Sequence, residues 1–267
     1  MLAQADSIAS TTEPSISFNG FIDAFYSYDF NNPTSDYRQS FLFNHNRHNE
    51  FNVNLALLEA KVSHQKYHAL IGIQTGTYAH DNYAAEKDVF KLVNQAYAGI
   101  SLNKKNTLWA DVGIFSSHLG FESAVSMDNL TLTRSLVAEN SPYFLTGAKV
   151  YYQTKTTTAL IMVSNGWQRI QRLQANSLPG IGTQLQHVFL DKMTLNWSTY
   201  LGSEYPDSLR KMRFFNNFYA ILELSDKWTV IADYDIGAEQ QSLNSNQYHM
   251  WQGAAIISRY KISQKTA

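Results

Sequence analysis

Apolar and polar residues alternate along most of the chain, which is the pattern of β-strands with one apolar and one polar face. In the segment that starts at Phe18, Phe18, Ile22 and Tyr26 fall on one face, and Asn19 and Asp23 fall on the other. The same alternation recurs near residues 96–102, 108–114, 193–201, 228–236 and 250–260. We count about twelve such segments of about 9–13 residues, so the sequence predicts an all-β protein with long strands.

Short polar segments that contain lysine separate these strands in pairs. They lie at 64–66, 103–106, 154–156, 191–192, 225–227 and 263–265. Each of the first five lies between two alternating runs, which is typical of a β-hairpin. Longer connections, at roughly 31–48, 77–94, 117–143, 166–178, 203–211 and 240–247, alternate strictly with the short ones. In an antiparallel up-and-down sheet, this order places the short turns on one rim and the long loops on the other.

One strand departs from simple alternation. Up to Leu57 the apolar residues occupy odd positions, and from Leu58 onward they occupy even positions. Because side chains alternate strictly along a regular strand, such a change of phase predicts a β-bulge near Leu57 and Leu58.

Three features favour a transmembrane β-barrel over a soluble sandwich. The strands match the ~9–11 tilted residues that cross hydrocarbon. Aromatic residues flank the short turns, as at Tyr67, Trp109, Trp228 and Tyr260, and a membrane interface selects such rings. Short turns on one rim and long loops on the other are typical of outer-membrane barrels, and a sheet in lipid must pair every backbone group.

The two ends of the chain are interpreted separately. Ala3 and Ala5 match the small-residue end of a secretory signal, so residues 1–14 are predicted to be a tail after or at the end of a signal peptide. Residues 15–267 are predicted to form one barrel domain. Because a sixth short turn at 263–265 has no strand after it, we expect this domain to be incomplete at its C-terminus; a small barrel with a frayed tail is the alternative.

Composition excludes several classes of protein. The 267 residues carry a net charge of −1 and include no cysteine, so there is no basic excess for nucleic acid, no disulfide and no thiolate site. No apolar run approaches the ~18 residues of a membrane-spanning helix. Histidines 45, 48, 64 and 68 lack a third ligand at metal spacing, and His118 beside two serines has no readable triad. We therefore expect no enzyme activity, no metal and no cofactor.

Candidate functional residues are charged side chains on the polar strand faces, where they would line a pore. They are Asp23, Asp29, Glu59, Lys61, Asp111, Lys149, Arg213, Glu223, Asp233, Asp235, Arg259 and Lys261. Charges of both signs around a lumen create a field that orients dipolar solutes. The alternative is that these charges pair with their neighbours and only solvate the wall.

The long loops supply candidates for a constriction or a mouth. Arg134 and Glu139 lie in a predicted helical turn at 132–139 of the longest loop, 117–143, which either folds inward or packs outside the barrel. Arg169 and Arg172 would share one face of a helix.

Several loop segments resemble the OmpL-like outer-membrane β-barrel porin family. The similar segments are 43–51, 76–86, 118–123, 132–143 and 165–172, and they occur in order within residues 16–262. The resemblance implies an outer-membrane barrel of a Gram-negative bacterium that allows passive passage of solutes, although family members look longer. Its partners would be membrane lipid and small hydrophilic solutes, and no interface signal supports an oligomer.

Three hypotheses follow from these observations. The first is a porin for passive diffusion of small hydrophilic solutes. The second is a non-conducting barrel that acts as a structural or adhesive platform through its long loops. The third is a soluble β-sandwich that binds carbohydrate.

Overall fold

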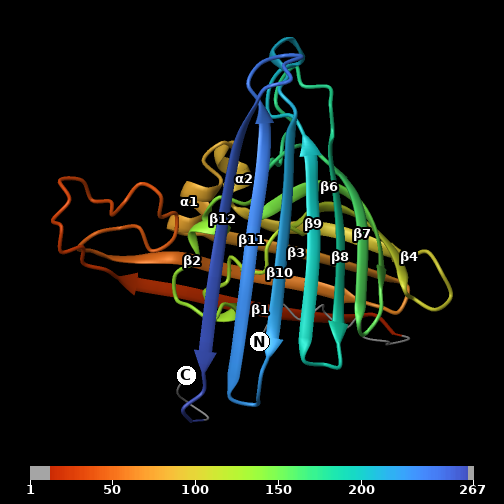
Figure 1. Ribbon diagram of the computed structural model, residues 1–267. Coiled ribbons are helices and arrows are strands. Elements are labelled where there is room, and N and C mark those ends of the chain that lie inside the picture. Colours follow the sequence, from red (N-terminus) through yellow and green to blue (C-terminus); the bar gives the residue numbers. More distant parts are fainter. Residues whose placement is uncertain (1–12, 264–267) are drawn as a thin grey trace.

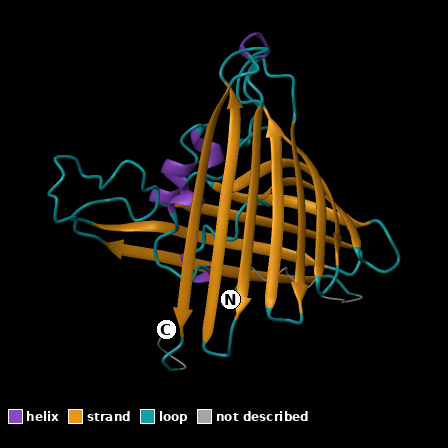
Figure 2. Ribbon diagram, in the orientation of Figure 1, coloured by secondary structure: helices purple, strands orange, loops and turns teal. Residues whose placement is uncertain are grey.

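The computed structural model describes residues 13–263, and they form one antiparallel sheet in which each strand pairs with its neighbours in sequence (Figures 1 and 2). The predicted all-β, up-and-down architecture is therefore confirmed. The predicted tail at 1–14 lies almost wholly outside the described residues, as does most of the predicted turn at 263–265. The twelve strands are β1 (Ser15–Tyr26), β2 (Phe51–Ser63), β3 (Tyr67–Thr75), β4 (Val93–Ser101), β5 (Leu108–Ser116), β6 (Phe144–Gln153), β7 (Thr157–Ser164), β8 (Gly180–Phe189), β9 (Met193–Gly202), β10 (Arg213–Glu223), β11 (Trp228–Gln240) and β12 (Tyr248–Tyr260).

Short and long connections alternate as predicted. Short turns span 64–66, 102–107, 154–156, 190–192 and 224–227, and the long loops span 27–50, 76–92, 117–143, 165–179, 203–212 and 241–247. The helices α1 (Thr77–Asn82), α2 (Asp88–Lys91) and α3 (Leu136–Glu139) and the 3-10 turns η1 (Ser126–Asp128) and η2 (Asp207–Leu209) all lie in long loops. Within residues 13–263, no helix has the length and apolar character needed to cross a membrane.

The curled sheet has an outer face and a concave face with different chemistry. Outward residues such as Ile71, Val112, Ile161 and Ile256 are apolar and more than half exposed. Since strand side chains alternate, the intervening positions point to the concave face, where they are mostly buried or half-buried. The outer face is thus a broad apolar surface, and no other layer formed by residues 13–263 covers it.

The change of phase in β2 lies three residues earlier than predicted. The register shifts between Asp23 and Ala24, which pair with Leu55 and Val53, so Asn54 is the extra residue of the bulge. The prediction near Leu57 was misplaced because it took the apolar residues from Phe51 to Leu57 as a single face, which included Leu55 and Leu57. Both are buried on the concave side under residues of the long loops.

The sheet is open between its first and last strands. Across residues 13–263, β1 is paired only with β2, and β12 only with β11. In Figure 1, β12 runs steeply down the front while β1 crosses the view behind it.

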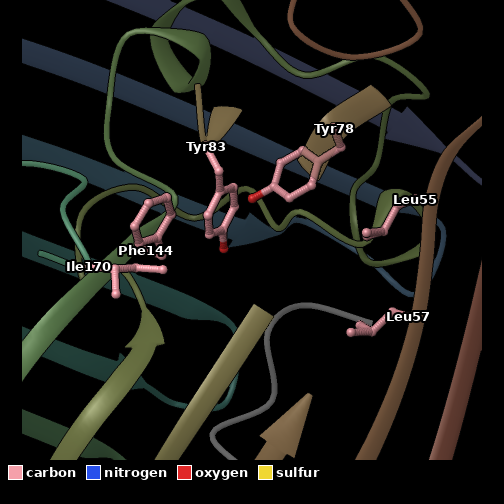
Figure 3. Close-up of a cluster of buried hydrophobic side chains, with 6 residues drawn as sticks. All are labelled: Leu55, Leu57, Tyr78, Tyr83, Phe144 and Ile170. Carbon is pink, nitrogen blue, oxygen red and sulfur yellow. The ribbon is translucent and has the colours of Figure 1, made fainter. Parts of the chain in front are cut away.

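Loop 76–92 folds onto the concave face and forms an apolar cluster there with the sheet. Tyr78 and Tyr83 reach from this loop toward Phe144 and Ile170, while Leu55 and its neighbour Leu57 come from β2 (Figure 3). The rings of Tyr83 and Phe144 stack with centroids 4.0 Å apart. Because burial of such side chains removes much apolar area from water, the cluster fixes the loop against the wall.

Candidate functional site

The longest loop, 117–143, crosses the concave face of the sheet, and we call it the inner loop. At its start, the Nε2 of His118 lies 2.9 Å from the backbone oxygen of Thr199 on β9. The backbone N–H of Gly120 donates to Oδ1 of Asn217 on β10 (3.1 Å). Farther along, the Ser126 hydroxyl donates to Oδ2 of Asp23 on β1 (2.9 Å). The structure thus decides between the two open readings of this loop: it folds inward and bridges strands near the two ends of the sheet.

Apolar contacts hold the inner loop between these polar anchors. Leu119 is buried against Tyr200 and Phe215, with Trp167 and Trp251 packed on the same cluster. A second group joins Phe121 and Leu130 of the loop to Tyr219, Ile221 and Ile231 of the wall. The loop therefore behaves as part of the core on this side of the sheet.

His118, the second residue of the inner loop, has a lowered pKa and is neutral near pH 7. Burial lowers its pKa to about 4; the hydrogen bond to Thr199 opposes this shift, and the charge of Lys149 adds to it. Because a carbonyl oxygen only accepts, Nε2 must carry the ring proton and donate it to Thr199.

Arg134 and Glu139 anchor the inner loop internally. The Arg134 guanidinium donates to the backbone oxygens of Ser123 (2.7 Å) and Ala124 and faces the ring of Tyr143. Glu139 accepts from the side-chain amide of Asn44 (2.8 Å), and burial raises its pKa. Both side chains are buried, so neither is free to attract solutes at an open mouth.

The helical turn in this loop is shorter than the predicted span 132–139. It covers only Leu136–Glu139, because the Ser135 side chain caps it by accepting from the backbone N–H of Ala138 (3.2 Å). Ser135 in turn donates its hydroxyl to Glu122, which ties the cap to the opposite arm of the loop.

The structure places most of the predicted pore-lining residues on the concave face. These are Asp23, Glu59, Lys61, Asp111, Lys149, Arg213, Glu223, Asp233, Asp235 and Arg259. The other two lie off the strands. β1 ends at Tyr26, so Asp29 belongs to loop 27–50, where it accepts from the Gln39 side chain (3.1 Å). Lys261 follows the end of β12 and is exposed.

Two acidic residues of β11, Asp233 and Asp235, lie beside Asn217 of β10. Asn217 is fully buried and donates its amide to Oδ1 of Asp233 (2.7 Å) and to Oδ1 of Asp235 (2.8 Å). Oδ1 of the same Asn217 accepts the hydrogen bond from the backbone N–H of Gly120, so one side chain joins the inner loop to this acidic part of the wall. The sequence analysis did not predict Asn217 as a functional residue because it lies between the aromatic residues Phe215 and Tyr219 on the same strand face. Its position in the alternation of β10, two residues from each of them, could have placed it on the concave face.

A different set of polar side chains lies on β3, β5 and β6. His68, Asp111 and Lys149 follow one another across the sheet, with Nε2 of His68 3.0 Å from Asp111 and Nζ of Lys149 3.5 Å from it. They line a cavity of about 320 Å³ between the wall and residues 116–118, which we call the Lys149 cavity. The sequence placed Asp111 and Lys149 on polar faces but missed His68, which was considered only as a metal ligand.

Asp23 is a junction between two loops and the wall. Besides Ser126, its Oδ2 contacts Nε2 of His45 (2.9 Å) and the amide of Asn54 (3.1 Å), the residue of the bulge. Burial lowers the pKa of His45, an effect that the nearby Asp23 opposes. The bulge therefore places Asn54 where it joins loop 27–50 to β1.

Arg169 and Arg172 do not share a helical face, because the segment 166–172 is irregular. Arg169 lies 3.4 Å from Glu204 and lines a second cavity, of about 250 Å³, together with Arg213. Arg213 is paired with Glu239 (2.7 Å). Arg172 is exposed and donates to the backbone oxygen of Ser177 (3.2 Å). The expected helix fails because Gly166 and Gln168 both adopt positive φ angles, which end a right-handed helix.

A family model identifies the class of this protein. The model of the family described as "Putative beta-barrel porin-2, OmpL-like" matches residues 15–267. The chain belongs to this family. The predicted resemblance is thereby confirmed, and membership in this OmpL-like family agrees with the apolar outer face and is consistent with an outer-membrane porin.

Other comparisons add little to this OmpL-like assignment. No curated protein matches the chain significantly. Among solved structures, "OmpT (in-vitro folded), an outer membrane protein of Vibrio cholerae" is similar over 97% of this chain and 85% of its own, with 8% identity and a TM-score of 0.40. Within residues 13–263, no three His, Asp or Glu side chains are grouped to hold a metal ion.

Proposed function

We propose that this protein is a porin of a Gram-negative outer membrane that lets small hydrophilic solutes diffuse through a lumen narrowed by the inner loop. One observation carries the proposal: the apolar face of the sheet points outward, and the opposite face is lined with charged and amide side chains. Lipid against the first face and water against the second would satisfy both.

The inner loop gives this lumen its proposed selectivity by size. It is anchored to β9, β10 and β1, and its residues Ser117 and His118 line the cavity of about 320 Å³. The cavity of about 250 Å³ lies between loops 76–92 and 165–179. Spaces of this size suit solutes of the monosaccharide or amino-acid class. The acidic wall at Asp233 and Asp235 and the lysine at 149 would orient dipolar solutes as they pass.

The proposal requires that the open edges of the sheet be paired in the membrane. The hydrocarbon core offers no hydrogen-bond partner, so the backbone groups along β1 and β12 need a β-strand partner there.

Conductance in a planar lipid bilayer tests the proposal. The full chain is expected to insert with stepwise increases in current. Replacing residues 121–134 of the inner loop with a short Gly-Ser linker should raise the unit conductance by about two-fold or more, because the loop occupies the lumen. The matched control replaces the outer loop 241–247 in the same way and should leave the unit conductance unchanged.

Two results would contradict the proposal. A full chain that migrates as a folded, heat-modifiable barrel but stays silent would favour the non-conducting platform. Equal conductance in the two loop variants would show that the inner loop does not narrow the path.

A further inference from the structure

The Lys149 cavity combines aromatic faces with fixed polar groups, and solute would reach it through the lumen of the proposed porin. Its volume of about 320 Å³ falls within the range of small-molecule sites. Tyr97, Phe115 and Tyr151 contribute rings to its lining, and Gln153 and Gln184 contribute amides. The site is therefore suited to a solute with both an apolar face and several hydroxyl groups.

The central charges of this cavity are balanced by one another. Asp111 lies between His68 (3.0 Å) and Lys149 (3.5 Å), so the lysine already has a carboxylate partner. The Lys149 amine also lies 4.3 Å from the centroid of the Phe115 ring and 5.4 Å from that of Tyr151, where the ring faces attract a cation. Because the charges of Asp111 and Lys149 balance each other, the pair offers hydrogen-bond donors and acceptors to a solute but attracts a free ion only weakly.

The wall of the cavity is shaped by glycine. Gly99 of β4 is paired with His68 of β3 and with Asp111 of β5. A Cβ at Gly99 would lie 2.0 Å from Oδ1 of Asp111 and 2.4 Å from Nε2 of His68. The polar pair can therefore lie flat against the backbone of β4 only because residue 99 has no side chain.

We propose that the Lys149 cavity is a binding subsite for a neutral sugar on the solute path. The apolar C–H face of a pyranose ring packs on an aromatic ring, while its hydroxyl groups donate to Asp111 and accept from Lys149 and the glutamine amides. Lys61 also lines the cavity, so an anionic sugar is the closest competing ligand, and the test separates the two.

Saturation-transfer NMR on the full chain in detergent micelles tests the subsite with three probes of similar size: glucose, gluconate and glucosamine. We expect glucose to bind with millimolar affinity and to give the strongest signal of the three. Tyr151→Leu should weaken glucose binding by about five-fold, because it removes an aromatic face while keeping an apolar side chain. Trp251→Leu is the matched control, since Trp251 packs in the separate cluster around Phe215, and it should leave binding unchanged.

The outcomes separate this inference from the proposed function. Absence of glucose binding, stronger binding of gluconate, or equal weakening by both variants would overturn the subsite. Lys149→Met gives a second check and should also weaken glucose binding. A protein that binds glucose in micelles but carries no current would overturn the porin proposal alone, and a conducting pore without glucose binding would overturn only the subsite.

Discussion

Gly113 shows how closely the strands and their side chains are packed on the concave face. Its φ angle is +139°, and a Cβ there would lie 2.1 Å from the backbone oxygen of Ala96 and 2.6 Å from Cα of Tyr97. Non-glycine residues adopt this backbone conformation only at a cost, and the nearby atoms belong to the backbone and cannot move aside easily. The sequence alternation treats Gly113 as a simple polar-face position and gives no sign of this constraint.

Substitution of Gly113 with alanine is expected to destabilise the barrel by about 1–3 kcal/mol, from backbone strain at a positive φ angle. Gly20→Ala is the control, because a Cβ at Gly20 has no atom within 4 Å except the Leu57 oxygen at 4.0 Å. Urea unfolding of both variants in lipid vesicles measures the difference. Equal midpoints would contradict the strain at Gly113.

At the scale of elements, the inner loop is the feature that determines the interior. Its length and position were readable from the spacing of the strands, but its inward course was not. That course depends on partners far away in sequence, such as Thr199, Asn217 and Asp23, whose contacts exist only once the sheet has curled. The helix limits have a different, local cause: capping by Ser135 shortens the turn predicted at 132–139, and positive φ angles at Gly166 and Gln168 prevent the helix expected for Arg169 and Arg172.

Titration of His118, at the start of the inner loop, should make the free energy of unfolding depend on pH. Burial lowers the pKa of His118 to about 4 from an ordinary value of 6.5. Between these values the unfolded chain binds a proton that the folded chain does not, so stability is full above about pH 6.5 and falls as the pH drops toward 4. The loss attributable to this residue is at most about 3 kcal/mol.

Urea unfolding at pH 4, 5, 6 and 7.5 measures this dependence. His118→Gln keeps a donor for Thr199 without titrating, and it should show a shallower loss of stability at low pH than the unmodified chain. His249→Gln, at an exposed position of β12, should retain the full slope. Identical slopes in all three proteins would rule out the assigned role of His118.

At the scale of the whole molecule, the sheet separates an apolar outer face from a polar concave face. The outer face is continuous over neighbouring strands, as at Val150 on β6, Ile161 on β7 and Leu185 on β8. In water a surface of this kind would drive association, whereas in a bilayer it contacts lipid. The soluble sandwich hypothesis finds no support in this arrangement, because no second sheet covers the apolar face in residues 13–263.

A lysine on this outer face tests its contact with lipid. Ile161 is 57% exposed in the middle of β7, and Ile161→Lys should destabilise the barrel in lipid vesicles by about 2–4 kcal/mol. Leu190→Lys is the control, because Leu190 is 93% exposed in the turn between β8 and β9 and lies outside the strands. Urea titration in vesicles compares the two, and similar stability would place Ile161 outside the hydrocarbon.

The strands, their order, the alternation of short and long connections, and the side of the sheet on which most charged residues lie could all be predicted from the amino-acid sequence. These properties are local, because a two-residue period and turn residues are encoded by neighbours in the chain. Three properties became visible only in the folded chain: loop 117–143 folds inward, Asn54 is the extra residue of the bulge, and His68, Asp111 and Lys149 share one cavity. These properties depend on side chains brought together from distant strands, and a linear pattern contains no information on which of them meet.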